Sequence, residues 1–102
     1  MDRIELYRVF TRVIETRSFT RAADTLQMPR SSVSTAIAEL EARLGARLLN
    51  RTTRVVAPTD EGEEFYERCL GFLAEGEEME AMFRSAARRI EGGGRYLLPG
   101  LV

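Results

Sequence analysis

The segment from residue 18 to residue 43 constrains the fold of this 102-residue chain more than any other. Two runs of apolar residues at helical spacing lie on either side of Pro29. A proline breaks the helix before it but is tolerated at the start of the next, where its missing N–H costs little. The apolar positions are Ala22, Ala23, Leu26 and Met28 in the first run, and Val33, Ile37, Leu40 and Leu44 in the second. The pattern predicts two short helices joined by a tight turn, a helix-turn-helix.

The outward side of the second helix carries side chains that are small or able to form hydrogen bonds. They are Arg30, Ser31, Ser34, Thr35 and Ala38, with Pro29 preceding them. A helix that enters the major groove of DNA needs such a side, because bulky apolar groups would hold it away from the base edges. An ordinary solvent-exposed helix also carries small polar residues, so this segment alone leaves both interpretations open.

Helical signals also flank this segment. Asp2 followed by Glu5 resembles a capping box that opens a first helix. Its apolar stripe, which we expect in the core, consists of Leu6, Val9, Phe10, Val13 and Ile14. Ser18 is suited to N-cap the second helix, and Gly45 to end the third in a left-handed conformation.

A small β-hairpin is predicted after the third helix. Residues 48–49 (Leu-Leu) and 55–56 (Val-Val) are short runs of strand-forming residues, and a polar loop separates them. Beside a helix-turn-helix, such a hairpin is a wing whose arginines, Arg51 and Arg54, contact phosphates or the minor groove. The alternatives are a solvated turn or, for Arg51, an ion pair with a helix carboxylate.

Residues 59–90 predict one long helix. Pro58 ends the hairpin, Thr59 is suited to N-cap the helix, and acidic residues fill the first turn, where the helix dipole favours them. A seam with steps of four and three follows over nearly four heptads: Phe65, Cys69, Phe72, Gly76, Met79, Phe83, Ala86 and Ile90. At ~1.5 Å per residue the helix is roughly 45 Å long. The small domain formed by residues 1–58 cannot bury the far end of this helix. The seam therefore predicts dimerisation, with an antiparallel crossing preferred.

Charge is divided unevenly along the chain. Residues 1–58 hold ten arginines and six acidic residues (+4), whereas residues 59–102 hold five and ten (−5). The basic front half suits contacts with phosphates. One cysteine and no histidine predict neither a disulfide nor a metal site, and Cys69 is expected to be a small buried residue. No cofactor and no enzyme activity are predicted. The chain shows no signal-peptide pattern or membrane-length apolar run, so a cytoplasmic location is expected.

Taken in order, these residues resemble the N-terminal DNA-binding domain of LysR-type transcriptional regulators. The resemblance covers residues 1 to about 91. It rests on residues 19–23 (FTRAA), 31–34 (SSVS), 44–45 (LG), 51–54 (RTTR) and 59–62 (TDEG), with Leu26, Ile37, Leu40, Glu41, Leu48 and Leu49 between them. It implies a mainly α fold: a winged helix-turn-helix of three helices and a small hairpin in residues 1–58, then a dimerisation helix in residues 59–91. Residues 92–102 would be a flexible linker or an added tail, with the family's effector-sensing domain absent.

The resemblance also implies a function and a set of contacts. The function is sequence-specific binding of double-stranded DNA, at an interrupted palindrome in bacterial promoters, by a homodimer that in a full-length protein could form a tetramer. The DNA contacts would come from Pro29, Arg30, Ser31, Ser34, Thr35 and Ala38 on the recognition helix and from Arg51, Thr53 and Arg54 on the wing. Many family members carry Ser or Thr at position 29, Gln at 30 and Arg or Lys at 35. Arg30 would therefore take over a phosphate or guanine contact, and Thr35 would touch a thymine methyl.

Two alternatives remain at this point. One is a dimerising interaction module that keeps the fold without acting on DNA by itself, which the net charge of −1 favours. The other is a winged-helix regulator of the molybdate-responsive type, whose DNA-binding domain is similar.

Overall fold

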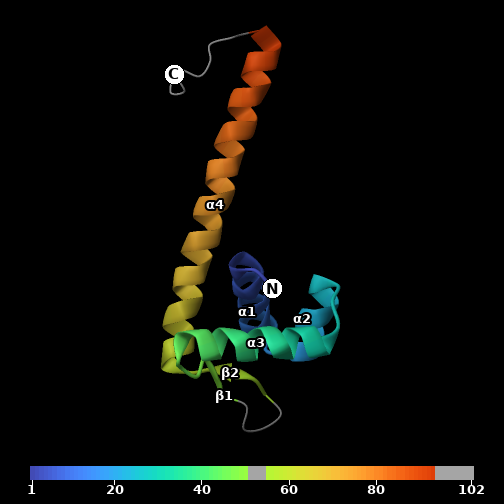
Figure 1. Cartoon of the computed structure of the whole chain (residues 1–102), viewed down its shortest axis with the longest axis vertical. Helices are drawn as coiled ribbons and strands as arrows, with labels where there is room; N and C mark the ends of the chain where they lie inside the picture. The colour runs from blue at the N-terminus through green and yellow to red at the C-terminus, as the bar shows by residue number, and fades with distance from the viewer. Residues whose placement is uncertain (51–54, 94–102) are drawn as a thin grey trace. The chain divides into compact units, whose positions relative to one another are not determined.

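A computed structural model describes residues 1–50 and 55–93, with side chains as far as residue 87. The elements are α1 (Arg3–Thr16), α2 (Phe19–Leu26), α3 (Arg30–Leu44), β1 (Leu49–Asn50), β2 (Ala57–Pro58) and α4 (Asp60–Gly93), as Figure 1 shows. This order confirms the mainly α, winged helix-turn-helix architecture. The chain forms two compact units, of which the first spans Met1–Gly71 and the second begins at Phe72.

The predicted caps account for where the helices begin and end. An Asp2 carboxylate oxygen accepts a hydrogen bond from the Glu5 N–H at 2.9 Å, and the Ser18 hydroxyl accepts one from the Arg21 N–H at 3.1 Å. Gly45 ends α3 at φ +67°, in the left-handed region that costs glycine little. Helices α1 and α2 end in the same conformation at the non-glycine residues Arg17 and Gln27.

The core of the first unit lies where α1, α2 and α3 pack against one another (Figure 1). The predicted stripes supply most of it, and its buried members include Leu6, Val9, Phe10, Val13, Ala22, Ala23, Val33, Ile37 and Leu40. One of the predicted core residues, Leu44, is instead exposed. Leu44 is the last residue of α3, and after the Gly45 turn Leu48 and Leu49 enter the core in its place.

The hairpin forms, but its second strand lies two residues later than predicted. Leu49 pairs with Pro58 and Asn50 with Ala57, so Val55 and Val56 precede β2. Val56 packs against the core while Val55 is exposed. Pro58 is the last residue of β2, so it ends the strand as predicted. It is tolerated there because both strands of a two-stranded sheet are edges, where a missing N–H costs little. The wing loop that contains Arg51, Thr53 and Arg54 lies outside the described residues.

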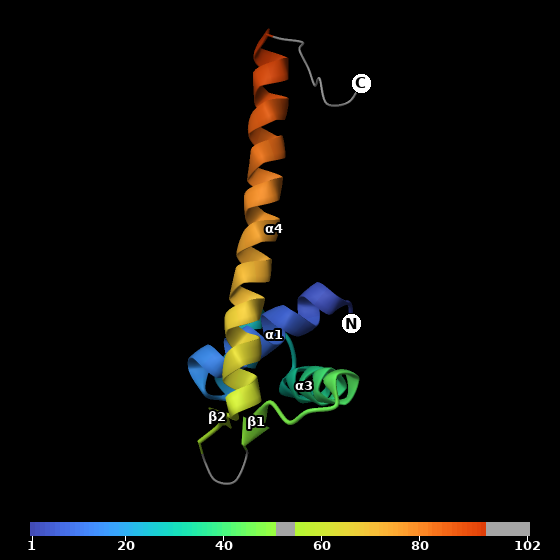
Figure 2. The same ribbon diagram turned by 90° about the vertical axis from the view of Figure 1, so that its left-hand side faces the viewer.

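The first turns of α4 pack on the rest of the first unit. The Thr59 hydroxyl accepts a hydrogen bond from the Gly62 N–H at 2.9 Å, as an N-cap should. The Phe65 ring lies against the rings of Tyr7 and Phe10, at centroid distances of 5.6 and 5.7 Å. The Tyr66 hydroxyl donates to a Glu15 carboxylate oxygen at 2.9 Å. Figure 2 shows these first turns of α4 near α1 and the hairpin.

This packing corrects the first two positions of the dimerisation seam. Phe65 packs on the chain's own core, and Cys69 is 2% exposed within it. Both side chains are used inside the unit, because α4 must cover the core before it can continue. The burial of Cys69 confirms its interpretation as a small core residue. Helix α4 also continues through Gly92 to Gly93, so the glycine run ends it later than predicted.

Burial of Cys69 makes stability depend on alkaline pH. Burial raises the pKa of the thiol from about 9 to about 11. The unfolded chain therefore releases this proton at a lower pH than the folded chain. The resulting stabilisation is fully present below the unfolded pKa and is lost as pH rises towards the folded one. The stability of the parent chain and of Cys69→Ala is measured by urea unfolding between about pH 8 and pH 11, a range that spans the two pKa values. The loss of stability at alkaline pH should be smaller for Cys69→Ala than for the parent chain.

Tyr66 is a second group whose titration affects stability at alkaline pH. Burial, then the hydrogen bond to Glu15, raise the pKa of the Tyr66 phenol, which shifts stability in the same alkaline direction. Tyr66→Phe should therefore remove a separate part of the alkaline loss. An identical pH profile for Cys69→Ala and the parent chain would contradict the burial of the thiol.

Within the described residues, no helix combines the length and the apolar character needed to cross a membrane.

Candidate nucleic-acid interface

The turn between α2 and α3 sets the direction of α3. Gln27 adopts φ +57°, and its N–H donates to the carbonyl oxygens of Ala23 and Asp24. The Met28 N–H donates to the Ala23 carbonyl oxygen at 3.1 Å, which closes the end of α2. Pro29 then occupies the N-cap position of α3 in an extended conformation. The chain thus passes from α2 to α3 through a turn of three residues, as in a helix-turn-helix.

The first turn of α3 has no side-chain cap, because the N-cap residue is a proline. The Pro29 carbonyl oxygen accepts hydrogen bonds from the Ser32 and Val33 N–H groups, at 3.0 and 3.3 Å. The backbone N–H groups at the start of a helix point away from its body and favour anions. This end of α3 is therefore suited to a phosphate or a base-edge acceptor.

The structure brings the predicted contacts of α3 to one exposed side. Pro29, Arg30, Ser31, Thr35 and Ala38 are exposed, and Ser34 is half-buried. The opposite side of the helix is buried by Val33, Ala36, Ile37 and Leu40. Arg51, Thr53 and Arg54 belong to the residues that are not described, so the wing contacts stay predictions.

Arg30 is held by a contact that the sequence analysis missed. Its guanidinium carbon lies 5.6 Å from the centroid of the Phe19 ring, at the start of α2. Phe19 is buried and belongs to the core, whereas Arg30 is exposed. A guanidinium over an aromatic face is attracted by the ring quadrupole. The cation at the start of α3 is thus attached to a rigid part of α2.

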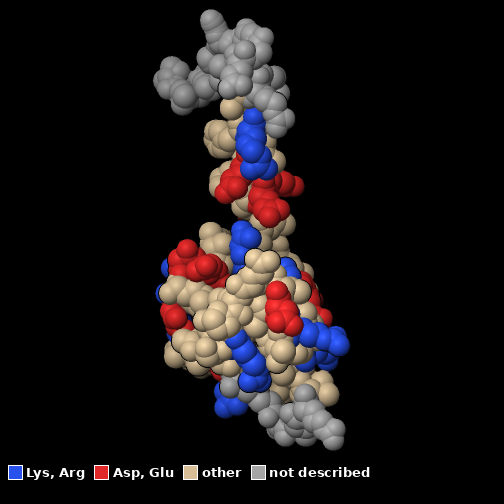
Figure 3. All heavy atoms as spheres, turned by 90° about the vertical axis from the view of Figure 1, so that its right-hand side faces the viewer, with Lys and Arg blue, Asp and Glu red and all other residues tan. Residues whose placement is uncertain are grey.

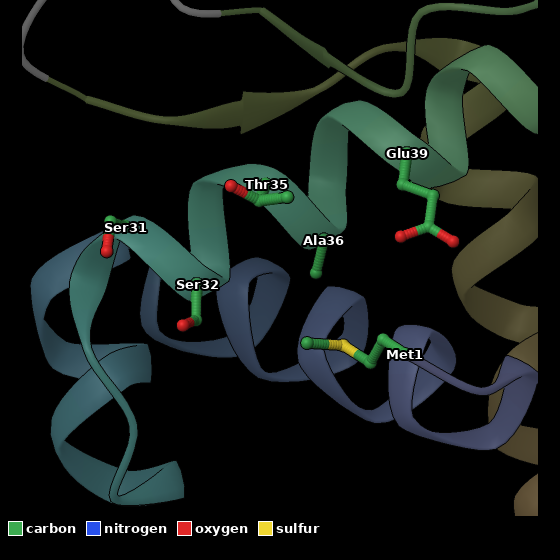
Figure 4. A pocket seen from close by; sticks show the side chains of 6 residues that line it. All are labelled: Met1, Ser31, Ser32, Thr35, Ala36 and Glu39. Atoms are coloured by element: carbon green, nitrogen blue, oxygen red, sulfur yellow. The ribbon is translucent and has the colours of Figure 1, made fainter.

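A shallow hollow of about 230 Å³ lies along α3 beside the first residue of the chain. It is lined by Met1, Ser31, Ser32, Thr35, Ala36 and Glu39 (Figure 4). Figure 4 shows the Met1 side chain on the opposite side of this hollow from Thr35. Ser31 and Thr35 were predicted contacts, but Glu39 was not. Glu39 follows Thr35 by four residues, and this helical spacing could have placed it beside Thr35 from the sequence. A glutamate carboxylate is able to accept a hydrogen bond from cytosine.

The base of the wing is attached to α3 through Glu41. One Glu41 carboxylate oxygen accepts hydrogen bonds from the Leu48 and Leu49 N–H groups, at 2.8 and 3.2 Å. The Thr59 N–H donates to the Leu48 carbonyl oxygen at 3.0 Å, which joins the residue before α4 to the residue before β1. In Figures 1 and 2 the hairpin accordingly lies close to α3 and to the first turn of α4. The hairpin is therefore fixed relative to the exposed side of α3.

Glu41→Ala should lower the free energy of unfolding by about 1–2 kcal/mol, because it leaves two partly buried N–H groups without their acceptor. Glu39→Ala is the matched control, since Glu39 is an exposed carboxylate on the same helix and should change stability by less than about 0.5 kcal/mol. Urea denaturation measures both. Equal effects would show that the Glu41 hydrogen bonds do not stabilise the hairpin.

The second unit exposes an apolar surface on α4. Met79, Met82 and Phe83 are 57%, 70% and 70% exposed, and Phe72 is also exposed. Phe72, Met79 and Phe83 were predicted for the dimerisation seam, whereas Met82 was missed. Gly76 and Ala86 are half-buried, and the Ile90 side chain is outside the described residues. Large apolar side chains with this exposure indicate an interaction surface.

Charges of both signs occur on the first unit. Figure 3 shows basic and acidic side chains interspersed on one face, with uncharged side chains between them. Among the described residues, no group of histidine, cysteine and acidic side chains could hold a metal ion. In the part of the chain that the structure describes, the candidate surfaces are the exposed side of α3 and the apolar surface of α4.

A sequence model of bacterial regulatory helix-turn-helix proteins of the lysR family matches residues 4–63. The chain belongs to the LysR family. It is 42% identical over 84 residues to an HTH-type transcriptional repressor of Pseudomonas aeruginosa, covering 82% of this chain and 26% of that protein. It is 41% identical over 99 residues to the transcriptional regulator YhjC of Escherichia coli, covering 97% of this chain and 33% of that protein. The chain thus spans about a third or less of the relatives that it matches.

Solved structures of LysR-family domains share the fold. The DNA-binding domain of BenM, solved with catB site 1 DNA, is 35% identical with a TM-score of 0.81, and the match covers 92% of this chain and 100% of that one. The CbnR DNA-binding domain, solved with DNA, is 27% identical with a TM-score of 0.79, and the match covers 84% and 99%. The relatives and the fold therefore agree on the family.

Proposed function

We propose that this chain binds double-stranded DNA sequence-specifically, with α3 in the major groove and the wing against the minor groove or the backbone. The observation that carries the proposal is the exposed side of α3, where Arg30, Ser31 and Thr35 stand opposite a fully buried apolar side. The N-terminal residues of a recognition helix reach base edges in this geometry. The solved complexes of BenM and CbnR with DNA support the same assignment.

The proposed DNA-binding form is a homodimer. Met79, Met82 and Phe83 expose apolar side chains on the second unit, and a second copy of α4 in antiparallel orientation would cover them. A two-fold dimer places two recognition helices one helical turn of DNA, or a multiple of it, apart. The expected target is therefore an interrupted palindrome.

The family relationship extends the proposal to the complete protein. The relatives are named as transcriptional regulators, and the matched regions are 26% and 33% of their lengths. We infer that the chain is the DNA-binding part of a cytoplasmic transcriptional regulator, which in full-length form could assemble into a tetramer.

The test is selection from a pool of duplexes with a randomised centre, followed by binding titrations with the selected duplex. The parent chain should enrich two inverted half-sites. Thr35→Glu should weaken binding by about 10-fold or more, because it places a negative charge against phosphates and base acceptors. Ala74→Glu, which adds the same charge to an exposed position of α4, is the matched control and should bind like the parent. A dimer that enriches no sequence would instead support an interaction module without DNA binding.

A further inference from the structure

We propose that Phe19 is a positioning residue for base recognition, and that its ring holds Arg30 so that the guanidinium reads a guanine. The inference rests on the proposed function. It favours guanine over phosphate as the contact of Arg30, and it adds a residue outside α3 on which that recognition depends.

The Arg30 guanidinium lies over the ring of Phe19. The Arg30 guanidinium carbon lies 5.6 Å from the Phe19 ring centroid. The ring itself is fixed, because Phe19 is 7% exposed and belongs to the buried core of α1, α2 and α3. A rigid ring therefore restrains a side chain that would otherwise sample many rotamers in water.

Arg30 lies at the N-terminal end of α3. It is the first residue of α3, directly after Pro29, and residues at this end of a recognition helix contact base edges. An arginine paired with the O6 and N7 atoms of guanine forms two parallel hydrogen bonds. That pairing requires the plane of the guanidinium to be set, whereas attraction to a phosphate needs only the charge.

A guanidinium that is attracted to a fixed aromatic ring samples fewer positions than one that is free in water. The ring thus restricts the Arg30 side chain before DNA arrives, and less freedom is lost when the guanine pair forms. A guanine contact uses this restraint, and a phosphate contact would gain much less from it.

The experiment compares four chains in the same selection from randomised duplexes: the parent, Arg30→Ala, Phe19→Leu and the double variant. The parent should enrich guanine at one position of each half-site. Arg30→Ala should lower that preference by about 10-fold, and Phe19→Leu by about 2- to 5-fold, the range of a cation–π contact at an exposed site. The double variant should resemble Arg30→Ala alone. Preferences at the other positions should not change.

Leu26→Ala is the control for loosening of the core, because Leu26 also lies on α2 and packs against the same cluster. It should lower stability and leave the guanine preference intact. The inference is overturned if Leu26→Ala lowers the preference as Phe19→Leu does, or if the Phe19 and Arg30 effects multiply. A parent chain that enriches no sequence would defeat the proposed function as well. An enriched motif that is insensitive to Arg30→Ala would defeat this inference alone.

Discussion

Gly62→Ala should lower the free energy of unfolding by about 3 kcal/mol, a large part of the stability of a domain this small. Gly62 is buried in the first turn of α4. A Cβ at this position would overlap the carbonyl oxygen of Leu48, which is a backbone atom and cannot rotate away. That carbonyl also accepts the Thr59 N–H, so moving it would disturb the link between the hairpin and α4.

Gly71→Ala is the matched control for this prediction. Gly71 lies in the same helix, and a Cβ there would meet no atom within 4 Å. The substitution should therefore stabilise α4 by up to about 1 kcal/mol, the helix propensity that glycine lacks. Chemical denaturation of the two variants should give changes of opposite sign. A Gly62→Ala chain as stable as the parent would contradict the close approach of α4 to the Leu48 backbone.

Met79→Glu combined with Phe83→Glu should convert the proposed dimer into a monomer. Two carboxylates would have to be buried in the proposed interface, for which these side chains are exposed, and unpaired buried charges are costly. DNA affinity should fall by about 100-fold or more, because the two half-sites would no longer be bound by linked domains. Sedimentation equilibrium and binding to the selected duplex measure the two effects.

Ala74→Glu combined with Ala81→Glu is the control for added charge. Both alanines are exposed on α4, and their spacing places them on the side opposite Met79 and Phe83. This variant should stay dimeric and keep most of its DNA affinity. A Met79→Glu, Phe83→Glu chain that remains a dimer would exclude this surface from the interface.

Local signals in the sequence predicted the helices well. Asp2, Ser18 and Gly45 act where a cap was expected, and each works within four residues of its own position. The apolar stripes of α1 to α3 predicted the core for the same reason, since helical periodicity is a local property.

Features that depend on distant residues were harder to predict. The register of β2 is set by Leu49 and by the Thr59 link to Leu48, and not by the strand propensity of the valines at 55–56. Leu44 is exposed because Leu48 and Leu49 take its place in the core. Phe65 and Cys69 fit a heptad pattern equally well whether they face a partner or the chain's own body.

The candidate site shows the same division. The exposed side of α3 follows from spacing alone, so Arg30, Ser31 and Thr35 could be named from the sequence. The Phe19 contact with Arg30 and the hydrogen bonds of Glu41 join residues on different elements, and they required the folded chain. Glu39 is four residues after Thr35, so helical spacing could have placed it on the same side, but it was not named from the sequence.

An NMR titration of the isotope-labelled chain with its selected duplex tests directly whether α3 enters the major groove. Our account predicts that backbone amide shifts change most at residues 30–38, the exposed side of α3 and its first turn. Changes confined to other elements, with α3 unaffected by saturating duplex, would contradict the entry of this helix into the major groove.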